Sequence, residues 1–222
     1  MFYKIWESGT LALGIWETIY MTLISSVFAY LIGLPLGVIL NITDATGIKP
    51  MPKLNSVLGF IVNFFRSIPF VILMVAMLPV AKFVVGTQLG NKAVIVMLVI
   101  AAAPYVARMV ESSLREVDAG VIEAARSMGA GTFEIIIKVL IPEAKPSLIT
   151  GGAIAVVTIL GYSAMAATLG GTGLGQIAVI YGHQRSNPDI TWICVFLTVI
   201  IVQIIQEIGT YVAKKTDKRI KN

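Results

Sequence analysis

The sequence predicts an all-α membrane protein with five transmembrane helices. Hydrophobic residues make up 57% of the 222 residues, charged residues make up 13%, and the mean hydropathy is +0.87. Soluble domains carry about 25% charged residues, so this composition is typical of an integral membrane protein. The apolar runs are continuous and do not alternate with polar residues, which favours spanning helices over the strands of a barrel.

Five segments are long enough to cross a bilayer, which requires about 20 mainly apolar residues. They lie at approximately 18–42, 57–85, 93–110, 148–169 and 190–212. A short amphipathic lead-in containing Leu11 and Trp16 is expected before the first span. The first apolar run exceeds the roughly 7–15 residues of a signal-peptide core, so we expect it to be retained. We expect residues 1–222 to form a single transmembrane domain.

The distribution of basic residues predicts the orientation in the membrane. Thirteen of the 17 Lys and Arg residues fall on one side of the predicted spans, and four fall on the other. The positive-inside rule therefore places the N-terminus outside and the C-terminus in the cytoplasm. The same rule accounts for the net charge of +5, so no nucleic acid partner is required.

Five spans are few to enclose a path for a solute. The sequence shows no internal repeat of the kind that builds many transporters within one chain. We therefore expect a homodimer, in which the helices of two copies surround a twofold axis.

The connection between the third and fourth spans, at 118–142, is charged and broken by glycine. Asp118 is expected to cap a helix over 119–128, which Gly129 would end in a left-handed conformation. Thr132 is expected to cap a second helix over 133–140. Pro142 and Pro146 would then mark the return to the membrane. The pattern predicts two short helices joined by a sharp turn, on the cytoplasmic side.

The first of these short helices combines apolar, small and charged residues. The apolar residues would be exposed beside a charged rim, and the small residues would allow another surface to approach closely. The candidate contact residues are Val121, Ile122, Glu123, Ala124, Ala125, Arg126, Met128 and Gly129. The alternative is a solvated connection whose apolar side chains pack back on the membrane domain.

The run Glu123-Ala124-Ala125, followed by Gly129 and by Ile141-Pro142, resembles the "EAA" loop of permease subunits in bacterial binding-protein-dependent ABC importers. The segments 66–70, 103–111 and 161–165 are similar to methionine-uptake permeases within that family. The resemblance covers essentially the whole chain. It implies the permease fold of a type I ABC importer, with the loop forming coupling helices that dock into two ATP-binding subunits.

The resemblance also implies a function. The chain would be the subunit of an ATP-driven importer that moves methionine into the cytoplasm by alternating access. An external substrate-binding protein would deliver the solute, and the complex would lie in the bacterial inner membrane. One alternative is the same architecture importing another amino acid or small polar solute. Another is an ATP-independent channel or carrier, whose typical buried Asp, Glu or His pairs are not evident.

Several kinds of chemistry are not expected of this chain. It contains no Gly-x4-Gly-Lys-Ser/Thr phosphate-binding loop, so ATP hydrolysis is expected in a separate subunit. One cysteine, Cys194, and one histidine, His183, cannot build a zinc or disulfide framework. We expect no cofactor, no metal and no catalytic residue.

A second group of candidates lies within the predicted spans. Arg66 either extends its charge to the membrane interface or pairs with another group, and Pro69 can kink the second span. Near the end of the fourth span, Tyr162, Ser163 and Met165 follow a stretch rich in small residues. That stretch either packs closely against another helix or presents these side chains to the translocation path. All five residues are candidates for lining that path.

Overall fold

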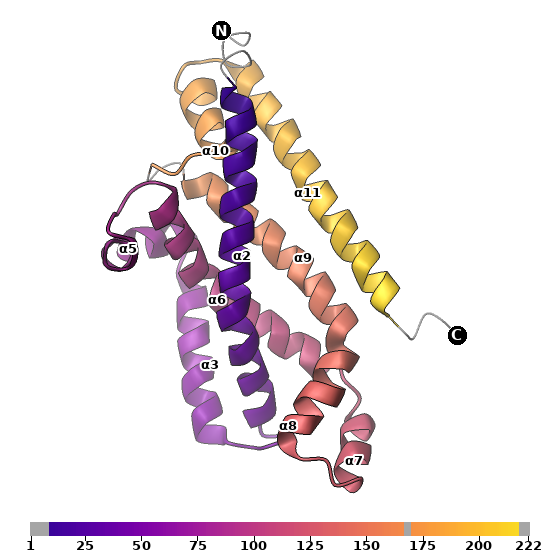
Figure 1. Ribbon diagram of the computed structural model, residues 1–222. Helices are drawn as coiled ribbons and strands as arrows, with labels where there is room; N and C mark the ends of the chain where they lie inside the picture. Colours follow the sequence, from indigo (N-terminus) through magenta and orange to yellow (C-terminus); the bar gives the residue numbers. More distant parts are fainter. Residues whose placement is uncertain (1–8, 167–169, 218–222) are drawn as a thin grey trace. The chain divides into compact units, whose positions relative to one another are not determined.

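A computed structural model describes residues 9–166 and 170–217, shown in Figure 1. Within these ranges the chain is helical, and no strand is present. The chain divides into two compact units. Unit 1 comprises Met1–Ala29, Ile68–Ala102 and Val156–Gln206, and unit 2 comprises Tyr30–Ser67, Ala103–Ala155 and Glu207–Asn222.

Four helices in the described ranges are long and apolar enough to cross a membrane, and a bent pair of helices would bring the number to five. This confirms the predicted all-α membrane fold. The elements are α2 (Thr10–Thr43), α3 (Pro52–Ser67), α4 (Phe70–Ala76), α5 (Leu78–Val85), α6 (Asn91–Arg115), α7 (Ala119–Ser127), α8 (Thr132–Ile135), the π-helix η1 (Ile136–Leu140), α9 (Ile141–Met165), α10 (Leu174–Ile177), the π-helix η3 (Ala178–His183) and α11 (Pro188–Thr216).

The first span begins earlier than the sequence predicts. α2 runs without a break from Thr10 to Thr43, so the expected lead-in is the first part of the spanning helix. Leu11 is buried in the core of unit 1, whereas Trp16 is exposed.

The segment predicted as one span at 57–85 is divided into three helices. α3 ends at Ser67, Pro69 is the N-cap of α4, and the two helices meet at an angle of 103°. Proline lacks the backbone N–H and disfavours helical geometry in the residue before it, which here is Ile68. α4 ends at Met77, and a second proline, Pro79, lies in the first turn of α5.

The fourth span also differs at its start. The sequence predicts a break at Pro142 and Pro146, whereas α8, η1 and α9 form one helix from Thr132 to Met165. The π-helical segment η1 lets the helix continue through this region, because the N–H of Ile141 bonds to the carbonyl of Ile136, five residues back. The predicted end of this span, at 167–169, lies outside the described residues.

In unit 2, two glycines of α2 bring its backbone against α6. A Cβ atom added to Gly37 would lie 2.5 Å from the carbonyl oxygen of Ala107, and one added to Gly33 would lie 2.7 Å from Cβ of Val106. Such spacing of small residues allows close helix packing in membranes. Beside this crossing, Leu40 of α2 and Val62 of α3 form a small buried cluster with Ala107.

The core of unit 1 joins the first part of α2 to α9, α10 and α11. Its buried members are Leu11, Leu160, Leu174, Ile177, Ile190, Cys194 and Ile201. A polar cluster holds the chain that precedes α10. Asn91 accepts hydrogen bonds from the backbone and hydroxyl of Thr172, and Thr18 accepts one from the backbone of Leu174. Unit 1 is therefore held by apolar packing and by side-chain bonds to a loop.

Candidate functional site

The charged connection between α6 and α9 forms two short helical segments joined by a turn, visible at the end of unit 2 in Figure 1. Asp118 is the N-cap of α7, and its Oδ1 atom accepts a hydrogen bond of 2.7 Å from the N–H of Gly120. Gly129 follows the end of α7 with a φ of +83°. The observed bounds of α7 agree with the predicted helix to within one residue, because both ends are set by local capping chemistry.

The start of the second helix differs from the prediction. Gly131 is the N-cap, and Thr132 is the first helical residue. The Glu134 carboxylate reaches back to the N–H of Gly131 at 3.4 Å, and it forms an ion pair with Lys138 at 2.8 Å. A carboxylate near a helix N-terminus is favourable because the unpaired backbone N–H groups there carry partial positive charge.

α7 presents two different faces. Ala125 is buried, with 4% of its surface exposed, and Ile122 is half-buried. Val121, Ala124 and Met128, spaced three and four residues apart, lie on the exposed face. The sequence assigned both Ala124 and Ala125 to close approach by a partner, but in this structure Ala125 packs on its own chain and only Ala124 is exposed.

The sequence reasoning missed two further exposed apolar side chains on the second helix. Phe133 is 75% exposed and Ile137 is 48% exposed, four residues apart at the start of the long helix. α7 lies against α8 and η1. The spacing of Phe133 and Ile137 within an otherwise charged segment could have identified them from the sequence. Together with Val121, Ala124 and Met128 they form an exposed set that we call the loop face.

Arg126 contacts a different part of the chain. Its guanidinium donates a hydrogen bond to the carbonyl of Ile48 in the connection between α2 and α3. Residues 44–51 of this connection, the α2–α3 turn, follow α2 closely: the N–H of Lys49 bonds to the carbonyl of Ile42 at 2.9 Å. The sequence offered no signal for this contact, because the two partners are 78 residues apart.

A charged network lies next to this turn. The Glu111 side chain is only 5% exposed, and both of its oxygens are paired: one with Arg108 at 2.6 Å and one with Arg115 at 2.8 Å. Arg115 also pairs with Asp44 of the α2–α3 turn. Arg108 in addition donates to Asn63 and to the carbonyl of Gly59 on α3. Burial of a carboxylate is tolerated only when it is paired in this way.

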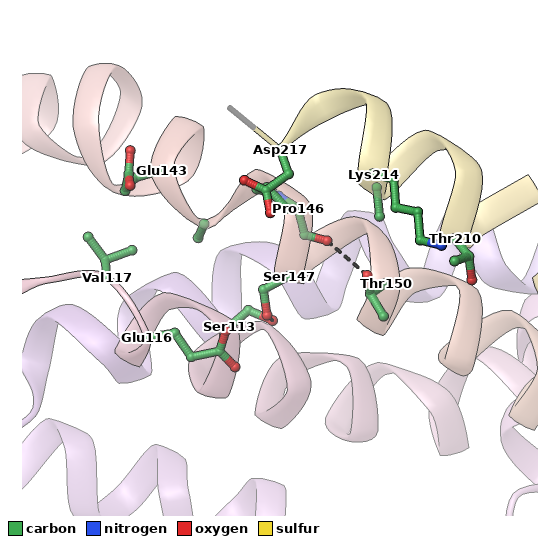
Figure 2. A pocket seen from close by; sticks show the side chains of 12 residues that line it. Ser113, Glu116, Val117, Glu143, Pro146, Ser147, Thr150, Thr210, Lys214 and Asp217 are labelled. Carbon is green, nitrogen blue, oxygen red and sulfur yellow. Dashed lines mark hydrogen bonds between the residues drawn. The ribbon is translucent and has the colours of Figure 1, made fainter. Parts of the chain in front are cut away.

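A cavity of about 400 Å³ lies near the loop, within unit 2. Figure 2 shows the lining side chains, which come from the end of α6, the first part of α9 and the end of α11. In the view, the hydroxyl of Thr150 donates to the carbonyl of Pro146, and Ser147 donates to Ser113 at 3.1 Å. Glu116 and Glu143 are also among the lining residues.

The candidates for the translocation path are placed in both units. Arg66 is exposed in the last turn of α3, in unit 2. The other four belong to unit 1. Pro69 precedes α4, and the ring of Tyr162 stacks on Phe70 with centroids 4.4 Å apart. Ser163 is buried and donates to the carbonyl of Leu160 at 2.7 Å, whereas Met165 is 49% exposed.

Within the described ranges, no group of three or more His, Cys, Asp or Glu residues could hold a metal ion. The loop presents exposed apolar side chains, and Arg126 bonds to the α2–α3 turn of the same chain.

The family model for the inner membrane component of binding-protein-dependent transport systems matches residues 10–221. The chain belongs to this family. Members of the family are membrane components of transport systems, in agreement with the expectation of a transport subunit that is not itself an enzyme. The type I importer permease fold is likewise confirmed.

Family members of known name are similar over almost the whole chain. The probable D-methionine transport system permease protein MetI of Vibrio cholerae is 46% identical, over 96% of this chain and 95% of its own. The methionine import system permease protein MetP of Bacillus subtilis is 48% identical over 82% of each chain. A chain of the inward-facing MetNI methionine ABC transporter is 44% identical, with a TM-score of 0.92, and the match covers 94% of this chain and 97% of that one.

Proposed function

We infer that this chain is the permease subunit of an ATP-driven importer that moves methionine into the cytoplasm. The observation that carries this conclusion is the identity of 44–48% to methionine permeases and to the MetNI transporter, which extends over 94–96% of this chain in two of the three comparisons. Solute selection and ATP hydrolysis belong to other subunits. This chain converts the movement of those subunits into access across the membrane.

The loop face gives this function a physical basis. Met128 is 82% exposed in the connection after α7, and Phe133 is 75% exposed in the first turn of the helix that follows. Exposed apolar clusters rimmed by charge are typical of protein contacts, because burying them on a partner removes apolar area from water. We propose that the loop face docks on ATP-binding subunits. Of the residues predicted from the sequence, Ala125 packs on its own chain and is left out of the contact. The contact residues would be Val121, Ile122, Glu123, Ala124, Arg126, Met128 and Gly129, extended by Phe133 and Ile137.

The proposed assembly follows from the topology. The whole chain, 1–222, acts as one permease domain, and two copies pair around a twofold axis with two ATP-binding subunits. The loop lies in the cytoplasm with the C-terminus, and the N-terminus lies outside, where an external substrate-binding protein delivers the solute. This orientation in the bacterial inner membrane rests on the surplus of basic residues around the loop and the C-terminal end.

Alternating access would then follow from a movement at the loop. Closure of the two ATPase subunits around ATP draws the docked loops together, and the helices attached to each loop reorient. We propose that Arg66, Pro69, Tyr162, Ser163 and Met165 lie along the path that this movement opens. The break between α3 and α4 supports the proposal, because a bend of 103° near the apolar region gives a point where helices can reorient.

The docking role is tested by changing one exposed side chain. Met128→Ser removes apolar area from the loop face without disturbing any buried contact. We expect less ATPase subunit to co-purify with the permease, and methionine uptake to fall in parallel. Phe83→Ser is the matched control, because Phe83 is 91% exposed but belongs to α5 in unit 1. Equal co-purification for both variants and the parent would argue against docking through this face.

The substrate is tested separately. The complete complex is reconstituted in liposomes with its binding protein, and uptake of labelled methionine is compared with uptake of other amino acids. ATP-dependent accumulation of methionine is expected. Preferential uptake of a different amino acid would favour an importer of another solute. Flux through liposomes that contain this chain alone would favour a channel or carrier.

A further inference from the structure

The α2–α3 turn is bound tightly to the end of α2. The N–H of Met51 bonds to the carbonyl of Thr43 at 3.0 Å, and the amide of Asn55 on α3 donates to the carbonyl of Leu40 at 2.7 Å. A Cβ atom added to Gly47 would lie 2.5 Å from the carbonyl oxygen of Ile42, so the turn lies directly on the helix end. Movement of this turn therefore moves the C-terminal end of α2 and the N-terminal end of α3.

α7 reaches the α2–α3 turn through polar side chains. A cavity of about 420 Å³ is bordered by Gly47 and Ile48 of the turn, by Arg115 of α6, and by Ile122 and Glu123 of α7. Because open space lies among these elements, apolar packing between α7 and the turn is incomplete. The Arg126 guanidinium crosses to the carbonyl of Ile48, and Arg115 joins the same turn to α6 through Asp44.

The arginine on α6 is itself held by a buried group. Glu111 lies one helical turn before Arg115, and its carboxylate binds Arg115 and Arg108 on its two oxygens. Since the Glu111 side chain is 5% exposed, its charge is desolvated and its partners have little freedom to leave. The Arg115 guanidinium is thereby held next to the Asp44 carboxylate. An ion pair thus joins α6 to the turn, and a hydrogen bond from Arg126 to a backbone carbonyl joins α7 to the same turn.

We propose that Arg126, together with the Arg115–Asp44 pair, forms a lateral link that carries the movement of α7 directly into the ends of α2 and α3. The chain already connects α7 to α6 and α9. The lateral link adds α2 and α3, so that α2, α3, α6 and α9 respond to one displacement. This inference rests on the proposed docking of the loop face, and it assigns Arg126 a positioning role toward Ile48 in addition to any contact with a partner.

The experiment measures the number of methionine molecules moved per ATP hydrolysed by the complete complex in liposomes. Arg126→Met keeps an unbranched side chain of about the length of the arginine's aliphatic part and removes the guanidinium donors. Because Arg126 is also one of the proposed docking contacts, the transport ratio is measured only in complexes that retain their ATPase subunits. In these complexes we expect the ratio to fall at least about fivefold, the lower end of the usual coupling between sites. Arg126→Lys retains one donor and is expected to restore part of the ratio.

A second set of variants tests the same link from the other side. Asp44→Arg and Arg115→Asp each place like charges together and should lower the ratio. The double exchange restores opposite charges between α6 and the turn but places a carboxylate beside Glu111, so it should recover part of the ratio. Lys138→Met is the matched control. Lys138 pairs with Glu134 four residues earlier on the same continuous helix. This exposed ion pair therefore connects no separate parts of the chain. The control should leave the ratio unchanged.

The outcomes separate this inference from the proposed function. If Arg126→Met and both charge reversals keep the parental ratio, there is no lateral link. The link is also overturned if transport and ATP hydrolysis fall in proportion, or if the ATPase subunit is lost, because Arg126 then acts in docking or stability alone. Failure of the parent complex to assemble or to move methionine would instead count against the proposed function.

Discussion

The ring of Phe70 stacks on the ring of Tyr162, with centroids 4.4 Å apart and an interplanar angle of 7°. Phe70 is the first residue of α4, directly after the break at Pro69, and Tyr162 lies near the end of α9. The helical hydrogen bonds of α3 do not continue into α4. The stack therefore holds the start of α4 against the end of α9. Both residues belong to unit 1.

Removal of the Tyr162 ring is expected to loosen this contact. Aromatic pairs contribute about 0.5–1.5 kcal/mol beyond the burial of their area, so Tyr162→Ala should lower the temperature of thermal unfolding in detergent. It should also reduce methionine uptake by the complex. Tyr162→Phe keeps the ring and should retain both properties. A Tyr162→Phe variant with normal stability and no uptake would show that the hydroxyl, and not the stack, is required.

Gly37→Ala is expected to destabilise unit 2. The new Cβ would lie 2.5 Å from a backbone oxygen of Ala107, and a backbone atom cannot rotate away. Forced overpacking typically costs about 1–3 kcal/mol. The measurement is the midpoint of thermal unfolding of the purified chain.

Gly161→Ala provides the matched control for that substitution. Gly161 is also inside a helix, but no atom lies within 4 Å of the position of its Cβ. Because alanine is favoured over glycine in helices by about 0.5–1 kcal/mol, this variant should be neutral or slightly more stable. Equal losses at both positions would mean that close packing of α2 on α6 does not explain Gly37.

Gly129→Ala should impair docking of the loop face. Its φ of +83° is unfavourable for a residue with a side chain, by roughly 1–2 kcal/mol, so the turn after α7 should shift. We expect less ATPase subunit to co-purify. Gly86→Ala carries the same strain at a φ of +79° after α5, and neither glycine has an atom within 4 Å of its Cβ position. If Gly86→Ala reduces co-purification equally, general destabilisation explains the effect.

Asp118→Ala should fray α7. The carboxylate accepts the N–H of Gly120, and loss of such a cap costs about 1 kcal/mol. Hydrogen exchange of the amides in α7 should therefore become roughly fivefold faster, while exchange in α6 stays unchanged. Asp118→Asn can still accept the bond and should resemble the parent. Unchanged exchange in the alanine variant would show that packing, and not the cap, holds the helix start.

Features that depend on neighbouring residues could be read from the sequence. The spans were predicted from continuous apolar runs, and the bounds of α7 were predicted from Asp118 and Gly129. The motif Glu123-Ala124-Ala125 with Gly129 indicated the family, which the match over residues 10–221 shows. The proline positions were also visible, but their effects were not: Pro69 coincides with a bend of 103°, whereas Pro146 lies inside a continuous helix.

The membrane class, the family and the existence of a two-helix loop could be predicted from the sequence, because they depend on composition, on capping residues and on a short motif. Which side of that loop is exposed depends on how the helices pack. The tertiary structure buries Ala125, leaves Phe133 exposed, and joins Arg126 to a carbonyl 78 residues earlier. The physical reason is that helical periodicity predicts which residues share a face of a helix. Which of those faces is buried depends on the neighbouring helices that pack against it.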